Sequence, residues 1–526
     1  MEINRALVGL GRYAPPRHSA PIDLKLDAGE SAGEHAKYPN ASALEAYLAE
    51  RYGIARDQVV VTAGADDALD RSCRAFLGPE REIIMPVPTF EMLGRYARIA
   101  GGIVREVSWP GGAYPVDAVL RAVNEETSII AVVSPNNPTG AVACAEDLER
   151  LSRAAPQALL LVDLAYVEFA DEDLTQAALA LPNALATRTL SKAWGLAGLR
   201  VGYALGSASI VEWLRRVGNP YAVAAPSLAT ARRCLESGEA AMRGRVAAVR
   251  RERGELARLL ERLGFEATAS QANFVYARSP KAPWLRDGLA GLGIGVRLIG
   301  DDAVRITCPG DAEPFARLAM GIESALAPQA ILFDMDGVLA DVSGSYRRAI
   351  VETAASFGVA VSAGDVARAK AAGDANNDWL LTQRLLSERG VQAPLSEIIA
   401  RFEAIYAEHA ASERLIPPRA LLDRLGVPFG VVTGRPRAQA ERFLQTWGIA
   451  PRALVCMEDA PPKPDPKPVR LALEQLGVER AWLVGDTPDD VRAARACGVV
   501  PIGFGAELPE SARTLSDLCL LEELLP

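Results

Sequence analysis

The amino-acid sequence predicts an α/β protein made of two units that follow one another along the chain. Short apolar runs without polar alternation, which are typical of buried strands in parallel sheets, alternate with amphipathic helical stretches. This pattern runs through the first two hundred residues and starts again abruptly at Ala330 with AILFD. At 526 residues the chain is also too long for one compact domain, because domains usually contain about 100–200 residues.

The composition excludes several classes of function. Acidic residues outnumber basic ones, 66 to 57, and the net charge of -9 argues against a nucleic-acid-binding protein, which usually presents a basic face. The 3 histidines are far apart and the 7 cysteines include no C-x-x-C pair, so we expect free thiols in a reducing compartment and no zinc cluster. Apolar runs such as IIAVV are far shorter than the ~20 residues of a membrane span. We therefore expect a cytoplasmic protein whose partners are small molecules, with neither nucleic acid nor membrane among them.

The first unit is predicted to contain a mainly parallel sheet. Strands are expected at 82–85, 128–133, 158–162 and 200–204. Ser42 and Glu45 form an S-x-x-E pair, which predicts a capping box at the start of a helix over 42–50. Alternation of such helices with buried strands is typical of α/β sheets.

A smaller α+β lobe is expected to follow. The pattern predicts one long helical stretch over 226–263, strands at 273–277 and 304–307, and a helix over 313–326. The long stretch is rich in arginine (Arg243, Arg245, Arg250, Arg251 and Arg253). Because Glu252 and Glu255 are interleaved with these arginines, a solvated helix face is favoured over an anion site.

The second unit is predicted to be an α/β core interrupted by a helical cap. Residues from Tyr346 to about Arg414 read as nearly all helix, between the strand at 330 and a strand over 429–432. We expect domain 1–328, with a large lobe at about 40–225 and a small lobe at about 1–39 and 226–328. Domain 329–526 would hold a core at 329–344 and 415–526 and the cap at 345–414.

The first chemical signal is an anion site. In VTAGADDALD (61–70), the amides of Gly64, Ala65 and Asp66 would lie at a helix N-terminus, where anions dock readily. Together with SPNNPTG (134–140) and TRTLSKAWGLAGLRVG (187–202), this segment resembles the fold-type I aminotransferases, which use pyridoxal 5'-phosphate (PLP). The resemblance covers roughly residues 1–328 and implies a large α/β lobe plus a small α+β lobe.

The resemblance assigns roles to individual residues. Lys192 would condense with the aldehyde of PLP, and burial near other cations would lower its pKa. Arg200, Thr189 and Ser191 would hold the phosphate, and Asp163 would pair with the pyridine nitrogen. Three further residues would contact the ring, Asn137 and Tyr166 at the phenolate oxygen and Phe90 on the face. Taken singly, Phe90, Ser191 and Ala65 also fit plain structural roles.

Within these enzymes the chain is most similar to the histidinol-phosphate aminotransferases. The similarity rests on KLDAGES (25–31), KYP (37–39), VDLAYVEF, NPY and SQANFVYAR (270–278). It implies a homodimer in which Tyr38 reaches the neighbouring phosphate, and a substrate phosphate or carboxylate held by Tyr13, Arg297 and Arg305. The chain has GESAGEH where the family usually has N-E-N-P-x-G, and a short loop between the two arginines. Both departures touch the substrate pocket.

The second chemical signal is FDMDGVLAD (333–341), with two carboxylates at the end of a strand. This motif, followed by FGVVTG, KPDP and GDTPDD, resembles the haloacid dehalogenase superfamily over about 330–526. The resemblance implies a Rossmann-like core in which Asp334 attacks a phosphoryl group and Asp336 carries protons. Lys463 would supply countercharge, and Thr433 and Gly434 would hold phosphoryl oxygens.

A magnesium ion is expected in this second site. Asp334, Asp336, Asp486 and Asp490 are its predicted ligands, and the last two, at i and i+4, could share one helix face. In the cap, Asn376, Asn377, Asp378 and Trp379 would either select the substrate or serve as a helix cap and a core residue.

These signals predict a bifunctional enzyme. The first domain would transaminate a phosphorylated keto compound with glutamate or 2-oxoglutarate as co-substrate, and the second would release phosphate from the product, as in histidine biosynthesis. Two alternatives stay open: a PLP-dependent decarboxylase or lyase acting on a phosphorylated amino acid, and a phosphatase-like half with a binding or regulatory role.

Overall fold

The computed structural model describes residues 1, 3–13 and 37–525. Two compact units make up the chain, Met1–Arg278 with Arg305–Phe315 and Ser279–Val304 with Ala316–Pro526. The predicted domain limit at residue 328 differs from these bounds and stays a prediction. The segments KLDAGES and GESAGEH, with His18 and His35, lie outside the described residues.

The first unit is built on a seven-stranded sheet. Its order is β1-β7-β6-β5-β4-β2-β3. The strands are β1 (Val59–Thr62), β2 (Glu82–Val87), β3 (Ile103–Ser108), β4 (Thr127–Val133), β5 (Leu159–Asp163), β6 (Ala184–Thr189) and β7 (Gly202–Gly206). Strands β2 to β6 run parallel, and β7 is antiparallel to both of its neighbours. The predicted α/β class with a mainly parallel sheet is therefore confirmed.

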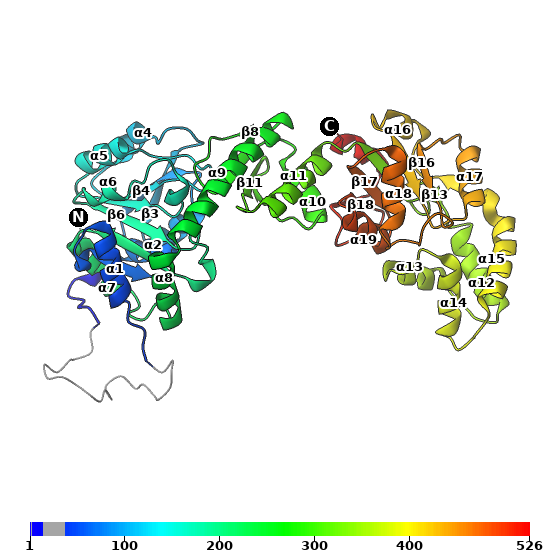
Figure 1. Cartoon of the computed structure of the whole chain (residues 1–526), viewed down its shortest axis with the longest axis horizontal. Helices are drawn as coiled ribbons and strands as arrows, with labels where there is room; N and C mark the ends of the chain where they lie inside the picture. Colours follow the sequence, from blue (N-terminus) through cyan, green and yellow to red (C-terminus); the bar gives the residue numbers. More distant parts are fainter. Residues whose placement is uncertain (2, 14–36, 526) are drawn as a thin grey trace. The chain divides into compact units, whose positions relative to one another are not determined.

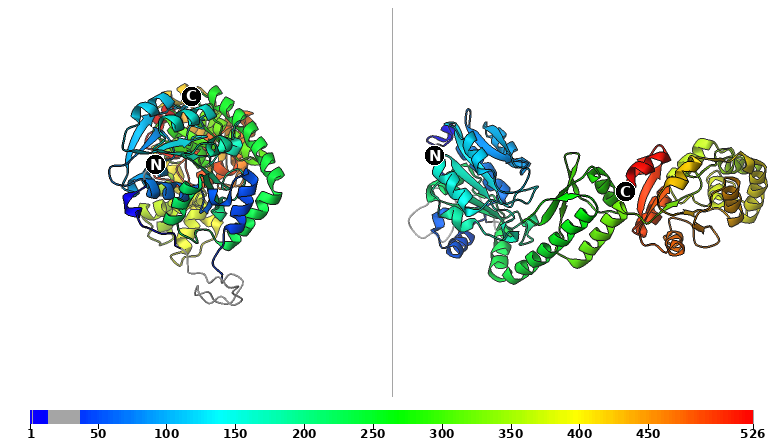
Figure 2. Two further views of the ribbon diagram at one scale, coloured as in Figure 1. Left: turned by 90° about the vertical axis from the view of Figure 1, so that its left-hand side faces the viewer. Right: turned by 90° about the horizontal axis from the view of Figure 1, so that it is seen from above.

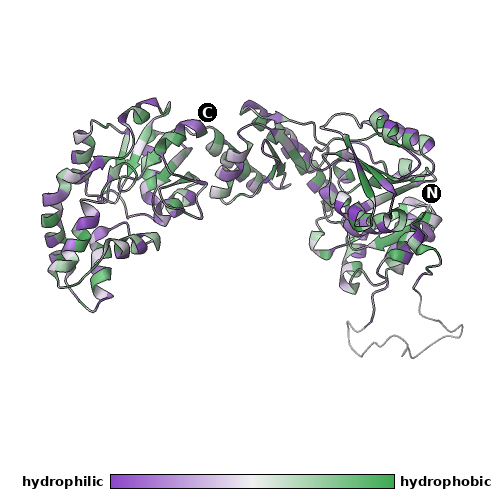
Figure 3. Ribbon diagram, turned by 180° about the vertical axis from the view of Figure 1, so that it is seen from behind, coloured by the Kyte–Doolittle hydropathy of each residue, from purple (hydrophilic) through white to green (hydrophobic). Residues whose placement is uncertain are grey.

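The described first unit contains nine α-helices. They are α1 (Ser42–Tyr52), α2 (Ala65–Phe76), α3 (Glu91–Ile99), α4 (Val116–Ala122), α5 (Ala145–Ala154), α6 (Thr175–Leu179), α7 (Ala208–Val217), α8 (Ala225–Ser237) and α9 (Glu239–Arg262). Helix α2 shows why they pack, because Leu69, Cys73 and Phe76 recur on one face and are buried in the core. The strands of the sheet are coloured mainly as hydrophobic in Figure 3.

Two local predictions are wrong. Helix α1 begins at Ser42 without a capping box, because the Glu45 carboxylate points into the protein and pairs with Arg215 at 2.9 Å. The long stretch over 226–263 is two helices that divide at Gly238. A side chain at Gly238 would lie 2.6 Å from the carbonyl oxygen of Cys234, so the chain turns there only with glycine.

The arginines of α9 are not a uniformly solvated face. Arg245 donates to the carbonyl oxygens of Ala193 and Trp194, each at 3.2 Å. Arg253 donates to the carbonyl oxygen of Ala272 at 2.8 Å, and Arg250 to that of Phe169 at 3.2 Å. Arg245 is nevertheless exposed, as predicted for a solvated face, whereas Arg250 and Arg253 are half-buried and depart from that prediction.

The small α+β region contains short strands and two helices. They are β8 (Glu266–Ala267), β9 (Phe274–Arg278), β10 (Arg297–Ile299), β11 (Ala303–Thr307), α10 (Ala282–Gly291) and α11 (Ala312–Leu326). Within the second unit, Trp284 of α10 stacks edge-on against Trp482 at 5.0 Å, and both indoles donate to carbonyl oxygens of α11. Two buried indoles therefore fasten α10 and α11 to the C-terminal sheet.

The second unit contains a six-stranded parallel sheet of order β16-β15-β12-β17-β18-β19. Its strands are β12 (Ala330–Phe333), β15 (Phe429–Val432), β16 (Ala453–Val455), β17 (Ala481–Gly485), β18 (Val500–Phe504) and β19 (Arg513–Leu515). The accompanying helices are α16 (Arg419–Arg424), α17 (Arg437–Thr446), α18 (Lys467–Leu476), α19 (Pro488–Ala496) and α20 (Leu521–Leu524). Strand β12, which carries the DxD motif at its end, is central.

A helical cap is inserted after the first strand of this core, as the sequence predicts. Its helices are α12 (Tyr346–Ser356), α13 (Ala363–Ala371), α14 (Asp378–Ser387) and α15 (Leu395–His409). They gather apart from the core strands in Figure 1, and Figure 2 shows them in yellow-green and yellow beyond the sheet. The chain enters and leaves the cap through an antiparallel pair, β13 (Ala340–Asp341) and β14 (Arg414–Leu415).

Candidate active sites

The first candidate site lies where parallel strands of the large sheet end. Asp163 is the last residue of β5, and its register partners are Val133 of β4 and Thr187 of β6. Clefts at the carboxyl ends of such strands are the usual ligand sites of open α/β sheets. The loop after β6 carries Lys192 over this edge.

An anion cradle lies beside the N-terminus of α2. Gly64 adopts φ +84°, and a side chain there would lie 2.7 Å from the Arg200 guanidinium, so glycine allows that close approach. Arg200 pairs with the Asp66 carboxylate at 3.2 Å and donates to the Ser191 hydroxyl at 3.4 Å. Thr189 donates to Ser191 at 2.9 Å. Two hydroxyls and a guanidinium beside helix amides suit a phosphate, and the carboxylate of Asp66 stands in for one here.

Lys192 lies among cations and an aromatic ring. Its amine is 5.3 Å from the centre of the Tyr166 ring. The residue as a whole is exposed, yet protein atoms surround the amine closely enough that burial is the largest cause lowering its pKa. The positive charges of Arg305 and Arg200 lower this pKa further. A lowered pKa favours the neutral amine that can condense with an aldehyde.

Two of the three predicted ring-binding residues, Asn137 and Tyr166, meet near Arg305. Its guanidinium donates to the Asn137 side-chain oxygen at 2.5 Å and lies 5.2 Å from the Phe274 ring. Because that oxygen accepts the bond, Asn137 can present its amide N–H groups to a phenolate. Tyr166 is buried and meets Phe274 edge-on at 5.3 Å. Asn137, Tyr166 and Arg305 thus belong to one cluster.

Asp163 is a buried carboxyl group with two local donors. Its Oδ1 accepts hydrogen bonds from the Thr187 hydroxyl at 3.1 Å and from the Ala165 N–H at 3.2 Å. Burial raises the pKa of Asp163 to about 6, although both hydrogen bonds oppose the rise. At neutral pH the group is therefore mainly ionised and able to pair with a protonated pyridine nitrogen.

This pKa predicts how the affinity for PLP depends on pH. As the pH falls through about 6, Asp163 takes up a proton and loses the charge that would stabilise a pyridinium, so the affinity should fall. Asp163→Asn should remove this part of the pH profile and slow transamination roughly 10²- to 10³-fold. The exposed Asp171 gives a control, Asp171→Asn, which should keep the profile. An unchanged profile in Asp163→Asn would show that this carboxyl group does not meet the cofactor.

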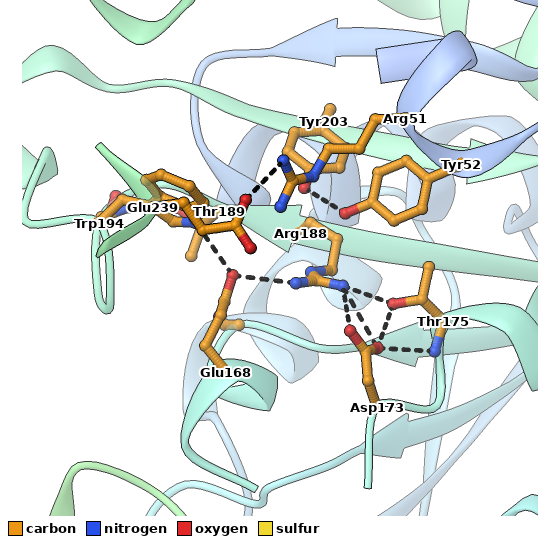
Figure 4. A network of polar contacts seen from close by, with 12 residues as sticks. Arg51, Tyr52, Glu168, Asp173, Thr175, Arg188, Thr189, Trp194, Tyr203 and Glu239 are labelled. Carbon is orange, nitrogen blue, oxygen red and sulfur yellow. Dashed lines mark hydrogen bonds and ion pairs between the residues drawn. The ribbon is translucent and has the colours of Figure 1, made fainter. Parts of the chain in front are cut away.

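A buried polar network supports the strand that leads to Lys192. Arg188 on β6 is fully buried, and its guanidinium pairs with Glu168 at 2.9 Å and with Asp173 at 3.1 Å (Figure 4). Glu168 also accepts a hydrogen bond from the indole of Trp194 at 3.3 Å. The network therefore joins β6 to the loop that carries Lys192. The sequence analysis did not single out Arg188, although it lies within the segment TRTLSK.

The structure shows the local surroundings of four further predicted residues. Phe90 packs against the core of the large sheet, which fits its alternative as a core residue. Tyr38 is half-exposed and stacks on Tyr221 at 4.3 Å, and Tyr13 is exposed. Arg297 is exposed on β10 and belongs to the second compact unit. The predicted roles of these residues in binding PLP or substrate stay predictions.

The second candidate site surrounds the end of β12. Lys463 is buried, and its ammonium contacts Asp334 at 2.7 Å, Asp490 at 2.5 Å and the carbonyl oxygen of Val432 at 2.9 Å. Burial opposes the charge of Lys463, but the two carboxylates outweigh it and raise the pKa. The lysine is therefore a fixed positive charge beside the expected nucleophile.

Three of the four predicted metal ligands converge. One oxygen each of Asp334, Asp486 and Asp490 lies within 4.8 Å of the others. Burial raises the pKa of Asp334 to about 8 and that of Asp486 to about 7, and the neighbouring carboxylates add to both rises. Asp334 and Asp486 therefore resist ionisation unless a cation compensates their charge, and oxygen donors are the ligands that Mg²⁺ prefers. The residues present therefore fit a magnesium ion.

The motif loop is shaped to receive these carboxylates. Gly337 adopts φ +80°, and a side chain there would overlap the carboxylate of Asp486. Asp486 lies between β17 and α19, so it is not on one helix face with Asp490 as predicted. Asp490 instead accepts hydrogen bonds from Thr487 as the capping-box residue of α19. Both residues nevertheless reach the same cluster.

Asp336 is directed to a different partner. Its Oδ1 accepts a hydrogen bond from the Nε of Arg435 at 2.5 Å, and Arg435 also pairs with Glu413 at 3.0 Å. The Asp336 side chain is not among the three that converge, so the structure gives no support to its predicted role as a metal ligand through that side chain. Thr433, two residues before Arg435, is buried and accepts a bond from the Arg435 amide.

Cap residues line the entrance of this site. A small pocket is bordered by Asp336, Tyr346, Asn376, Asn377, Asp378, Trp379, Gly434, Arg435, Pro436 and Met457. Asn376 donates to the carbonyl oxygen of Lys463 at 3.1 Å, and Lys370 pairs with Asp378 at 2.9 Å. The buried Asp489 accepts hydrogen bonds from the amides of Asp374 and Ala375, which fastens this cap loop to the core.

Two of the predicted cap residues have structural roles. The Asn377 side chain caps α14 by accepting from the amides of Trp379 and Leu380 at 3.1 Å. The indole of Trp379 donates to Glu403 at 3.1 Å. Asn377 is thus a helix cap that also borders the pocket, and Lys370, Glu413 and Arg435 are site residues that the sequence analysis missed.

The magnesium ligands can be tested directly. Asp486→Asn should weaken Mg²⁺ binding at least roughly 10-fold, because one oxygen donor loses its charge in a cluster of three. Isothermal titration of the chain with MgCl₂ measures this, with Asp423→Asn, in an exposed pair with Arg419, as the control. Equal affinities of Asp486→Asn and the unaltered chain would exclude Asp486 as a ligand.

The fold and the two sites define the class of the protein: a transferase centre built around a lysine and an anion cradle, and a hydrolase centre built around carboxylates. The family models agree. "Aminotransferase class I and II" matches residues 9–318, and "haloacid dehalogenase-like hydrolase" matches residues 328–498. The chain belongs to the class I and II aminotransferases, and a haloacid dehalogenase-like hydrolase domain follows on the same chain.

Curated relatives include several histidinol-phosphate aminotransferases. That of Paracoccus denitrificans is 36% identical over 252 residues, which cover 46% of this chain and 67% of the relative. Histidinol-phosphate aminotransferase 2 of Nitrosospira multiformis is 30% identical and covers 68% of this chain and 91% of its own length. An imidazoleglycerol-phosphate dehydratase of Phytophthora nicotianae is 47% identical over 193 residues, 33% of this chain. The chain spans only 43% of the length of that relative.

Solved structures support the fold of the first half. A histidinol-phosphate aminotransferase of Sinorhizobium meliloti, in complex with pyridoxal-5'-phosphate, aligns with a TM-score of 0.51 and 22% identity over 55% of this chain and 84% of the other. The residues of the first site fit the same cofactor, because cradle, lysine and buried carboxyl group are all present. Among the described residues, none of the helices is both long and apolar enough to cross a membrane.

Proposed function

We propose that the chain is a bifunctional enzyme that transaminates and then dephosphorylates the same small phosphate ester. The first reaction is the interconversion of imidazole-acetol phosphate and histidinol phosphate with glutamate and 2-oxoglutarate. The second is hydrolysis of histidinol phosphate to histidinol and phosphate. Joining the sites on one chain raises the local concentration of the intermediate at the second site.

One observation carries this proposal: a centre suited to phosphoryl transfer shares a chain with a region similar to histidinol-phosphate aminotransferases. The dehydratase relative supports the same substrate class, since its name also describes an imidazole-bearing phosphate ester. Residue positions support the first chemistry. PLP, when bound, withdraws electrons from the substrate carbon that loses its proton. Lys192 then moves that proton through its Nζ, while Asp163 holds the proton on the ring nitrogen.

In the second site the chain's own groups supply the steps. A carboxylate oxygen of Asp334 attacks phosphorus, and the P–O ester bond breaks as Asp336 protonates the leaving oxygen. Asp336 next takes a proton from water, which attacks phosphorus and frees Asp334 and phosphate. Lys463 balances part of the negative charge, and a magnesium ion that Asp334, Asp486 and Asp490 would hold would balance the rest. We place the enzyme in the cytoplasm as a homodimer formed through the aminotransferase half.

Two variants test each half separately. When Lys192→Ala inactivates the first site, the chain with Mg²⁺ should still release phosphate from histidinol phosphate. With the second silenced by Asp334→Asn, it should still form glutamate from histidinol phosphate and 2-oxoglutarate. Absence of glutamate together with release of carbon dioxide from a phosphorylated amino acid would replace the aminotransferase by a decarboxylase. Failure of phosphate release alone would refute the paired function.

A further inference from the structure

We propose that Arg435 is the positioning residue of the second site, which aligns Asp336 for proton transfer and ties that alignment to the base of the cap through Glu413. The inference rests on the proposed phosphatase function and adds a residue to it. Arg435 directly follows Thr433 and Gly434, so it leaves the phosphoryl-binding end of β15.

The guanidinium of Arg435 is held between two carboxylates. Its side chain is completely buried, with an exposed fraction of 0%. The Nε donates to Asp336 at 2.5 Å, and the Nη1 donates to Glu413 at 3.0 Å. A buried guanidinium is tolerated only with such partners, because removing its charge from water is costly. The pair of contacts therefore fixes the direction of both carboxylates.

Aromatic rings restrict the guanidinium further. It lies 4.6 Å from the centre of the Tyr346 ring and 5.5 Å from that of Phe443. Its Nη2 atom is buried and has no hydrogen-bond partner within the described part of the chain. In the planar fork Nη2 is next to Nε, so a small rotation of Asp336 would bring its second oxygen onto Nη2. The Asp336 carboxylate can therefore bind the Arg435 guanidinium in two ways, through Nε alone or through Nε and Nη2 together.

Glu413 connects this donor to both ends of the cap. It immediately precedes β14, the strand by which the chain leaves the cap, and β14 pairs with β13 at the cap entrance. Glu413 also accepts a hydrogen bond at 2.9 Å from Ser345, which precedes the first cap helix. A shift of the cap on this hinge would move Glu413 and, through Arg435, the carboxylate of Asp336.

A residue that positions Asp336 should affect poor and good leaving groups to different extents, which a merely structural residue would not do. Asp336 protonates the leaving oxygen, and a poor leaving group depends on that proton more than a good one does. Misalignment of Asp336 should therefore slow hydrolysis of phenyl phosphate more than that of p-nitrophenyl phosphate. The two esters have nearly the same shape, and p-nitrophenolate leaves more readily without a proton.

The test compares kcat/KM for these two esters in the full chain with Mg²⁺. Glu413→Gln keeps the size of the side chain and removes its charge, and Arg435→Lys keeps a charge but cannot reach both carboxylates as a fork. Both variants should lose roughly 10- to 100-fold more kcat/KM on phenyl phosphate than on p-nitrophenyl phosphate. Glu522→Gln, in an exposed pair with Arg424 at 2.9 Å, is the matched control and should leave both values unchanged.

The outcomes separate the inference from the function on which it rests. Equal losses on both esters, in whichever of the two variants folds with the melting temperature of the control, would overturn the positioning role alone. The positioning role would also be overturned if the variants kept the same ratio of the two kcat/KM values as the unaltered chain. If the unaltered chain with Mg²⁺ hydrolyses neither these esters nor histidinol phosphate, the proposed phosphatase function is overturned and the inference with it.

Discussion

Lys192→Ala should abolish the visible absorbance band that PLP acquires when it is covalently attached to the protein, and it should slow transamination about 10²- to 10⁴-fold. The reason is that Lys192 combines a pKa lowered by burial and by Arg305 and Arg200 with a place beside the anion cradle. Absorbance spectroscopy of the chain titrated with PLP measures the band directly.

A second lysine serves as the control for this experiment. Lys281 precedes α10 in the second compact unit, and Lys281→Ala should keep both the band and the activity. If the band survives in Lys192→Ala, another lysine holds the cofactor, and the assignment of the first site is wrong. If Lys192→Ala loses activity but keeps the band, Lys192 is likewise not the lysine that is attached to PLP.

Asp334→Asn should lower the rate of phosphate release roughly 10⁴- to 10⁶-fold for every phosphate ester that the chain hydrolyses. Asparagine keeps the shape of the side chain but removes the nucleophilic oxygen and the charge that faces Lys463 at 2.7 Å. Colorimetric phosphate assays measure the rate. Mass spectrometry of the chain quenched during turnover should show a phosphoryl group on the unaltered protein and none on the variant.

An exposed aspartate gives the matched control. Asp423 pairs with Arg419 on the surface, and Asp423→Asn should retain full activity. Hydrolysis that continues in Asp334→Asn would show that the nucleophile is a different group or a water molecule. In that case the carboxylate cluster would retain only its role as a candidate metal site.

Much of the fold could be predicted from the sequence because its signals are local. The apolar strands β4 and β5 are buried along their whole length, and such runs appear in the sequence without reference to any partner. Residues at the carboxyl ends of such strands could be predicted to face ligands for the same reason, as with Asp163 at the end of β5 and Asp334 directly after β12. In a parallel sheet the carboxyl ends of all the strands lie along the same edge.

The remainder depends on contacts between distant parts of the chain. Arg435 meets Asp336 across 99 residues, and Lys463 meets Asp334 across 129. No spacing in the sequence indicates that Asp336 turns toward Arg435 and away from the metal cluster. The same limit explains why the predicted capping box at Ser42 does not form, since Glu45 makes a buried ion pair with Arg215 instead of the expected local bond.

The most direct test follows phosphorus through both reactions in the unaltered chain. The protein with PLP and Mg²⁺ is given imidazole-acetol phosphate and glutamate, and ³¹P NMR is recorded with time. We predict that the signal of the ester passes through histidinol phosphate to inorganic phosphate, and that omitting glutamate stops the series at its start. Accumulation of histidinol phosphate without any inorganic phosphate would contradict the claim that one chain performs both steps.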